Sequence, residues 1–145
     1  MSENNNIPNA EEIDFTDVEA AREFFLKDRY ATDVTGIDIL EVDRDYAKCV
    51  LNIDERHLNA QGFLMGAVLF TMADFTFAVS TNFRRPVTVT LNANISFLSG
   101  TKGKTLYSES RLIKDGRRNC FFEVMITDDL GTKVAVINIT GAHVG

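Results

Sequence analysis

The hydrophobic pattern of the chain is dominated by one long apolar stretch, residues 65–81, built largely from Met, Ala, Val, Leu, Phe and Thr. Its length favours a helix over a buried strand. Apolar residues lie on all sides of this helix, which is typical of the central helix of a domain. Asp74 is its only charged residue, and a buried carboxylate costs free energy unless a partner or a chemical role compensates.

The remaining pattern predicts mainly strands, because apolar and polar residues alternate along it. The cleanest alternation covers residues 87–97, after Pro86 has ended the helix. Short turns such as Asp115-Gly116 connect successive strands, so the sheet is expected to be mostly antiparallel. The other predicted elements are an amphipathic helix over residues 16–30, a hairpin over 37–42 and 46–53, and strands over 105–114, 117–127 and 133–144.

This order of elements predicts an α+β fold in which a curved antiparallel sheet wraps around one long central helix. The chain has 145 residues, which is the length of one domain. We assign residues 16–145 to that domain. Residues 1–15 are polar and acidic, and we expect them to form a flexible N-terminal segment.

The composition argues against some classes of binding partner. A net charge of −6 argues against nucleic acid or an anionic membrane surface. The sequence shows neither a membrane span nor a secretory signal pattern, so a cytoplasmic location is the expectation. Cys49 and Cys120 are interpreted as free buried thiols, and two cysteines with two histidines provide no metal-ligand spacing.

Asp74 occupies a defined side of the central helix. At about 100° per residue, Ala67, Thr71, Asp74 and Ala78 form one narrow stripe of small or polar residues. Bulk is low there, so another group can approach closely. One interpretation is a carboxylate in a dry crevice, where desolvation tunes its chemistry. One alternative is a packing seam in which Asp74 forms a salt bridge across a dimer interface. The other is a plainly exposed Asp74, which the apolar surroundings disfavour.

Gly66 lies at the start of the same helix, where the first backbone N–H groups have no partner within the helix. Such groups can stabilise an oxyanion. Gly66 and Asp74 are separated by about 12 Å of helix, yet an oxyanion donor and a base acting on one carbonyl must both lie within about 3 Å of the reacting atoms. If both are catalytic, the site must be shared by two antiparallel copies of this helix, and the protein must be a dimer.

The segment HLNAQGFLMGAVLFTMADFTFAV, residues 57–79, resembles the HxNxxGxxHGGxLFxLADxAFA segment of hotdog-fold acyl-CoA thioesterases of the phenylacetic-acid-degradation (PaaI) type. TVTLNANISFL, residues 88–98, resembles the strand that follows in that family. The resemblance covers about residues 20–144. It implies a hotdog fold, a homodimer often paired into a homotetramer, and active sites at the dimer interface with acyl-CoA as substrate.

The resemblance also implies roles for four residues. Asp74 falls on the family's general base or nucleophile, and Gly66 on the amide that polarises the thioester carbonyl from the other subunit. Asn59 falls on a side chain that assists that amide. Thr90 falls on a hydroxyl that orients the water. By strict alternation Thr90 faces away from its own chain's core, so we expect it to reach a site only in the assembled oligomer.

The expected function is hydrolysis of a small, medium or aryl acyl-CoA thioester to the free acid and CoA, without a metal or redox cofactor. The family's His-Gly-Gly is Met65-Gly66-Ala67 here, so a side-chain donor is lost. A non-catalytic acyl-CoA-binding or sensor protein is therefore the alternative. A hotdog hydratase ranks last, because no histidine lies in residues 64–82. Candidate contacts for the CoA phosphates are Arg84-Arg85, Lys102-Gly103-Lys104 and Arg117-Arg118.

Overall fold

The computed structural model of the chain describes residues 13–144. Most of the segment predicted to be flexible, residues 1–15, therefore lies outside the described residues. No helix in the described part is long and apolar enough to cross a membrane. The elements in chain order are α1 (Val18–Phe25), the π-helix η1 (Tyr30–Thr35), β1 (Asp38–Asp43), β2 (Tyr46–Asn52), the 3-10 helix η2 (Glu55–His57), α2 (Gly66–Asn82), β3 (Thr88–Phe97), β4 (Thr105–Asp115), β5 (Asn119–Asp128) and β6 (Lys133–His143).

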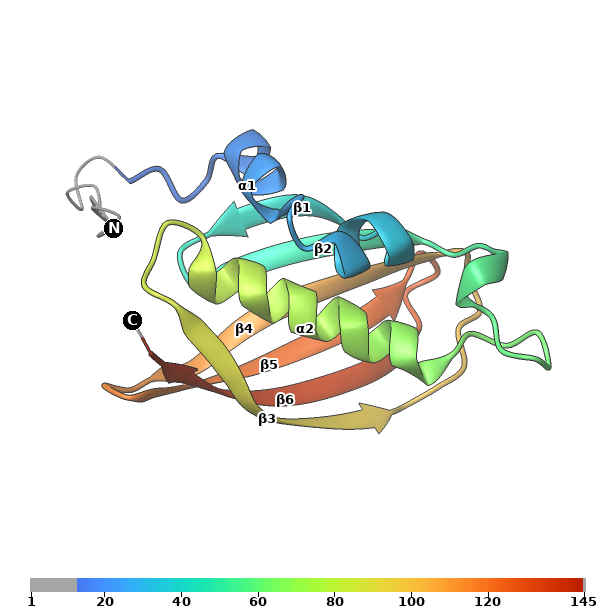
Figure 1. The fold of residues 1–145 in the computed structure, drawn as a ribbon. Coiled ribbons are helices and arrows are strands. Elements are labelled where there is room, and N and C mark those ends of the chain that lie inside the picture. The colour runs from blue at the N-terminus through green and yellow to red at the C-terminus, as the bar shows by residue number, and fades with distance from the viewer. Residues whose placement is uncertain (1–12, 145) are drawn as a thin grey trace.

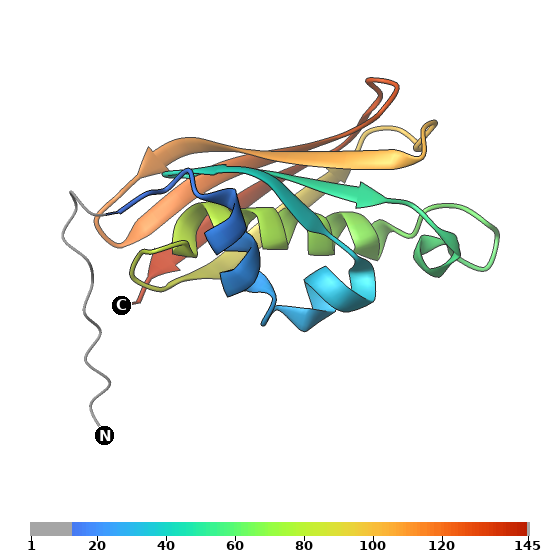
Figure 2. The same cartoon turned by 90° about the horizontal axis from the view of Figure 1, so that it is seen from above.

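The six strands form one antiparallel sheet in the order β1-β2-β4-β5-β6-β3. Helix α2 lies along one face of this sheet, and the sheet curves around it (Figures 1 and 2). Strands β1 and β3 are the two edges. The predicted α+β arrangement, a curved antiparallel sheet around one long central helix, is confirmed.

The core lies between α2 and the concave face of the sheet. Phe77 of α2 is 1 % exposed, and its ring meets Phe122 of β5 edge-to-face at 5.4 Å between centroids. A Cβ atom at Gly141 of β6 would lie 2.6 Å from the Phe77 ring, so the glycine lets helix and strand approach closely. Cys49 and Cys120 are free and buried, as predicted. Burial raises the pKa of Cys49 to about 12, so its thiol stays protonated.

The first helix is shorter than predicted. Helix α1 ends at Phe25, and residues 30–35 form a separate π-helix that ends at Gly36 with φ 90°. Ala21 and Phe25 pack into the core, whereas Leu26 is 63 % exposed. The residues after Phe25 therefore no longer pack into the core, and packing no longer stabilises a longer helix. The helix ends there, and the chain turns to pass over α2.

Strand β3 contains a β-bulge. It pairs with β6 in antiparallel register, but the register shifts between Thr90 and Asn92. A bulge adds one residue to one strand and changes which side chains face each side. Thr88 and Thr90 before the bulge, and Ala93 and Ile95 after it, therefore face α2.

Candidate functional site

Asp74 lies in the middle of α2 and contacts β3 of its own chain. The hydroxyl of Thr90 donates a hydrogen bond to Asp74 Oδ1 at 3.1 Å. The expectation that Thr90 faces away from its own core was wrong, because it assumed unbroken alternation along β3. The bulge at Leu91 reverses the phase of the strand, so Thr90 points at the helix within one chain.

The environment of Asp74 differs from the predicted dry crevice. Asp74 is exposed in the single chain, where it lines an open groove of about 300 Å³. Phe75 and Ala78 of α2 form one side of this groove, and Asp28 and Tyr30 lie on the segment opposite. Water reaches the carboxylate in the single chain, so a dry site would need a further surface over it.

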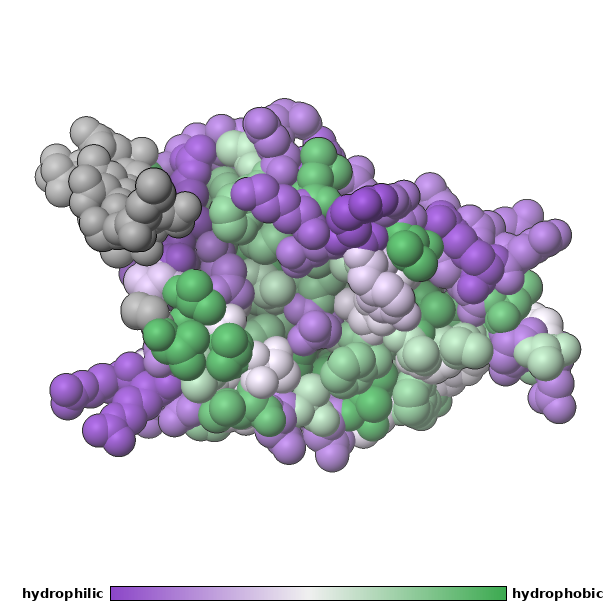
Figure 3. All heavy atoms as spheres, viewed as in Figure 1, coloured by the Kyte–Doolittle hydropathy of each residue, from purple (hydrophilic) through white to green (hydrophobic). Residues whose placement is uncertain are grey.

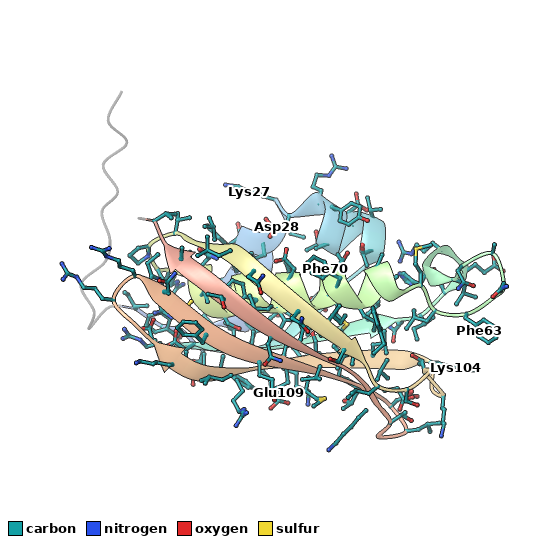
Figure 4. All side chains as sticks on the ribbon, turned by 90° about the horizontal axis from the view of Figure 1, so that it is seen from below. Lys27, Asp28, Phe63, Phe70, Lys104 and Glu109 are labelled. Atoms are coloured by element: carbon teal, nitrogen blue, oxygen red, sulfur yellow. The ribbon has the colours of Figure 1, made fainter. Side chains whose placement is uncertain are left out.

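Asp28 is a site residue that sequence reasoning missed. Figure 4 shows it on the segment that crosses over α2, above the helix that carries Phe70. Burial, and then the negative charge of Asp74, raise the pKa of Asp28. Its place between α1 and η1 depends on the turn after Phe25, and no local pattern in the sequence indicates that turn.

Gly66 is the first residue of α2, whereas Asp74 lies in the middle of the helix. Met65 precedes Gly66 in extended conformation, with ψ 133°, and no side chain among residues 13–144 caps the helix. A Cβ at Gly66 would lie 3.0 Å from the Phe97 ring. Phe97 and Gly66 line a second pocket, of about 720 Å³, together with Phe63, Leu64, Leu69, Leu98, Ser99, Gly100, Thr101, Lys102 and Val134.

Asn59 shapes the loop that leads into α2. Its side-chain oxygen accepts the backbone N–H groups of Gln61 at 3.0 Å and Phe63 at 3.1 Å, which is an Asx-type turn. These bonds occupy the oxygen, so the carboxamide NH₂ is the group available to a ligand. Asn59 therefore belongs to the loop that enters α2 at Gly66, whereas the groove of Asp74 lies along the middle of that helix.

His57 is a structural residue, although it opens the motif. Its Nδ1 accepts the backbone N–H of Asp54 at 2.9 Å, so the proton of the neutral ring is on Nε2, which donates to the carbonyl of Thr35 at 2.7 Å. The ring is 2 % exposed. His57 therefore ties the loop before α2 to the end of η1.

A second histidine, His143, anchors the start of β3. Its Nδ1 lies 3.0 Å from the hydroxyl of Thr88, and its Nε2 lies 2.8 Å from Asp115 Oδ1. The chain of groups has the order of a hydroxyl–histidine–carboxylate triad. Thr88 is only 6 % exposed, so a substrate cannot reach its hydroxyl. The network instead holds β3 against β6, two residues before Thr90.

The turn at residues 99–104 forms one wall of the Gly66 pocket and is held by Asp128. This buried carboxylate accepts backbone N–H groups from Lys102 at 2.9 Å and Gly103 at 3.0 Å through Oδ2. Its Oδ1 accepts those of Leu130 and Thr132. Burial opposes ionisation of Asp128, but these N–H donors outweigh it and hold its pKa well below the usual range.

Two of the three predicted basic segments differ in their contacts. Arg84 contacts Asp17 and the carbonyl of Asp14, and Arg85 is paired with Asp45. The lysines are different: Lys102 lines the Gly66 pocket, and Lys104 projects at the same end of the sheet as the Phe63 loop (Figure 4). Among the described residues neither lysine forms an ion pair.

The single chain therefore brings together half of the predicted site residues. Asp74 and Thr90 are hydrogen-bonded. Asn59 and Gly66 lie at the start of α2, and Gly66 faces a different pocket from Asp74. Apolar surface extends over this face of the molecule between polar rims (Figure 3). Phe70 of α2 and Phe97, whose ring lies against Gly66, are exposed apolar side chains.

Comparison with known proteins gives consistent matches. The profile of the family described as the thioesterase superfamily matches residues 61–135. The acyl-coenzyme A thioesterase PaaI of Escherichia coli K12 is 26 % identical over 111 residues, which cover 76 % of this chain and 79 % of that protein. The solved structure of the E. coli PaaI protein superposes with a TM-score of 0.78 at 21 % identity, covering 88 % of this chain and 96 % of that one.

A Streptococcus mutans protein solved with bound acetyl-CoA is a further structural match. It superposes with a TM-score of 0.71 at 25 % identity, covering 75 % of this chain and 89 % of that one.

Proposed function

Because the chain belongs to the thioesterase superfamily and has the PaaI-type hotdog fold, we propose that it is a thioester hydrolase that converts an acyl-CoA to the free acid and CoA. The observation that carries this proposal is a carboxylate, Asp74, oriented by a hydroxyl on the open face of the central helix. The named PaaI relative and the acetyl-CoA complex of the S. mutans protein support CoA thioesters as the substrate class.

In this proposal Asp74 activates water. The Thr90 hydroxyl holds Oδ1, which leaves Oδ2 to accept a proton from a water placed against the thioester carbonyl. Water oxygen bonds to the carbonyl carbon, the resulting oxyanion collapses, and the C–S bond breaks to release the CoA thiolate, which takes up the proton. A direct attack by Asp74 to form an anhydride, hydrolysed in a second step, uses the same geometry.

The oxyanion donor comes from a second subunit. Gly66 and Asp74 of one chain are about 12 Å apart along α2 and face separate pockets, so they cannot act on one carbonyl. Two antiparallel α2 helices about a two-fold axis would place the Gly66 N–H of one subunit opposite Asp74 of the other. Such a homodimer would cover the exposed Asp74 groove and exclude water from it.

The edge strand β3 supports association through this face. Within the described part of the chain it is unpaired on one side, and Val89 and Leu91 are 41 % and 59 % exposed. An apolar unpaired edge is unfavourable for an isolated chain, because it offers free backbone groups to another strand. Burial of this edge and of the α2 face would stabilise the dimer, and two dimers would form the expected tetramer.

The substrate is divided between the two pockets. The acyl group would lie in the groove of Asp74, where Phe75, Ala78 and Tyr30 provide apolar contact for a small, medium or aryl group. The pantetheine arm would run past Gly66 of the partner subunit, where the Asn59 carboxamide can donate to the thioester oxygen. Lys102 and Lys104 at that end are the basic side chains suited to the CoA phosphates.

Met65 supports the second candidate function, a non-catalytic acyl-CoA sensor. Its side chain is 46 % exposed and provides no hydrogen-bond donor at the helix start. The thioester carbonyl would then be polarised only by the backbone N–H of Gly66 and the side chain of Asn59. A sensor would bind acyl-CoA in the same groove and release it unchanged.

One pair of measurements separates the two functions. Hydrolysis of short-chain, medium-chain and aryl acyl-CoAs is measured for the wild type and for Asp74→Asn, alongside binding by calorimetry. We expect the wild type to hydrolyse part of the panel and D74N to lose about 10²–10⁴-fold in kcat, while it still dimerises and binds acyl-CoA. Binding without turnover by the wild type would establish the sensor; wild-type rates in D74N would remove Asp74 from the mechanism.

A further inference from the structure

Buried hydroxyl groups connect α2 to the sheet beneath it. Thr76 Oγ1 lies 2.5 Å from Ser108 Oγ, and Ser80 Oγ lies 2.6 Å from Ser110 Oγ. All four residues are at most 2 % exposed. They are polar groups buried at the contact between α2 and β4, where Leu, Ile or Val would pack without any hydrogen-bonding requirement.

The two pairs match in spacing. Thr76 and Ser80 are one turn apart on the same face of α2, which is about 6 Å along the helix axis. Ser108 and Ser110 are alternate residues on the same face of β4, which is about 6.7 Å along the strand. Both pairs form together only when the helix has one rotation and one axial position on the sheet. A shift by a single residue would break both and leave buried hydroxyls without partners across the interface.

Helix α2 needs such a constraint because its apolar residues do not provide one. Apolar side chains lie on all its sides, so hydrophobic burial alone favours several rotations of the helix almost equally. Each hydroxyl also bonds within the helix, Thr76 to the carbonyl of Met72 and Ser80 to that of Thr76. These bonds hold the side-chain rotamers that point at β4.

Asp74 lies on the opposite side of the helix. Thr76 and Ser80 are about 160° and 120° away from it around the axis. The hydrogen bonds that hold these hydroxyls against β4 therefore also fix the direction in which Asp74 points, toward Thr90 and the groove. The same rotation of α2 sets the direction of the Gly66 N–H at the start of the helix.

We propose that Thr76, Ser80, Ser108 and Ser110 are positioning residues, which set the rotation and axial position of α2 and thereby place Asp74 and Gly66 for catalysis. The proposal rests on the proposed function, because it assigns the hydroxyls a role through Asp74. It explains why four polar side chains occupy the core at the α2–β4 contact.

Thr76→Val with Ser108→Ala tests this proposal, because the two hydroxyls are partners across the interface between α2 and β4. Removing both partners of a buried pair is nearly neutral for stability. We therefore expect a near-unchanged melting temperature and KM, but a kcat lower by about tenfold to a hundredfold, since displacement of a catalytic group by about 1 Å has effects of that order.

Two matched variants control for nonspecific effects. The hydroxyl of Thr81 is also buried in α2, but it donates to the carbonyl of Phe77 and accepts from the Asn82 side-chain amide, both in its own helix, so Thr81→Val should retain wild-type kcat. Thr76→Ser keeps the hydroxyl and should also retain it. An unchanged kcat in the double variant, or an equal loss in Thr81→Val, would overturn the proposal.

The crystal structure of the double variant separates this inference from the proposed function. If the wild type hydrolyses no acyl-CoA, the proposed function fails, but the position of α2 is still measurable. We expect the double variant to have a displaced or rotated α2 in which the Asp74–Thr90 hydrogen bond is lost. An unmoved helix with that bond intact would overturn the positioning role independently of turnover.

Discussion

The hydroxyl of Thr90 on the edge strand β3 donates a hydrogen bond to Asp74 in the middle of α2, at 3.1 Å within the same chain. The bond joins β3 to α2, the helix that lines the groove with Asp74, Phe75 and Ala78. It fixes the orientation of a carboxylate that would otherwise be free to rotate at the surface. The β-bulge at Leu91 makes this contact geometrically possible.

Removing this hydroxyl should impair turnover more than binding. Thr90→Val keeps the shape of the side chain but leaves Asp74 Oδ1 without its donor. We expect kcat to fall by about tenfold to a hundredfold with little change in KM, while Thr90→Ser, which retains the hydroxyl, stays near the wild type. Steady-state kinetics on one confirmed acyl-CoA measure the difference, and equal kcat in Thr90→Val and the wild type would show that the bond has no catalytic role.

The bulge also illustrates what the sequence could and could not reveal. The alternation of apolar and polar residues was sufficient to predict the strands, and the length of the apolar run was sufficient to predict α2. The order of these elements then indicated their arrangement. Asp74 was identifiable because it is the only charge in an apolar helix. The side of β3 on which Thr90 lies depends on one extra residue in the strand, and no local sequence signal indicates it.

Long-range placement explains the other differences. Asp28 lines the Asp74 groove only because α1 ends at Phe25 and the chain then crosses over α2. The pairing of Thr76 with Ser108 joins residues 32 positions apart. Such contacts depend on how complete elements pack, and patterns read along one segment do not contain that information.

Restoring the histidine of the family motif should increase the rate. In Met65→His the imidazole would stand beside the Gly66 N–H at the helix start and add a donor for the developing oxyanion. Loss of one such donor typically costs about 10²–10³-fold in kcat, so we expect a gain of up to about tenfold from a donor added without its supporting contacts. Hydrolysis assays on the wild type and Met65→His test this, and a decrease in kcat at unchanged stability would show that the altered start of α2 is already adapted to Met65.

Asp128 should make stability depend on acidic pH. Its pKa is held below the usual range by hydrogen bonds from the backbone N–H groups of Lys102, Gly103 and Thr132, which outweigh the effect of burial. The folded state therefore favours the ionised form, and this contribution is present above the ordinary pKa of about 3.9 and is lost as pH falls below it. In Asp128→Asn an NH₂ group would face backbone N–H donors.

We expect Asp128→Asn to have a lower melting temperature than the wild type at pH 7, with the difference shrinking as the pH falls below about 4. The 99–104 turn should also loosen, which would weaken CoA binding at the Gly66 pocket. Thermal melts across pH and calorimetry with CoA measure both effects. A melting-temperature difference that stays constant down to pH 2 would rule out the carboxylate charge as the cause.

The most direct test of a site shared by two subunits is complementation between two inactive variants. Asp74→Asn and Asn59→Ala are purified separately, then unfolded together in equal amounts, refolded, and assayed on a confirmed acyl-CoA. If Asp74 of one subunit works with Asn59 and Gly66 of its partner, each heterodimer contains one intact site, and random pairing restores about a quarter of wild-type activity. If each site is built from a single chain, every site in the mixture carries one substitution, and the activity stays at the level of the two variants alone.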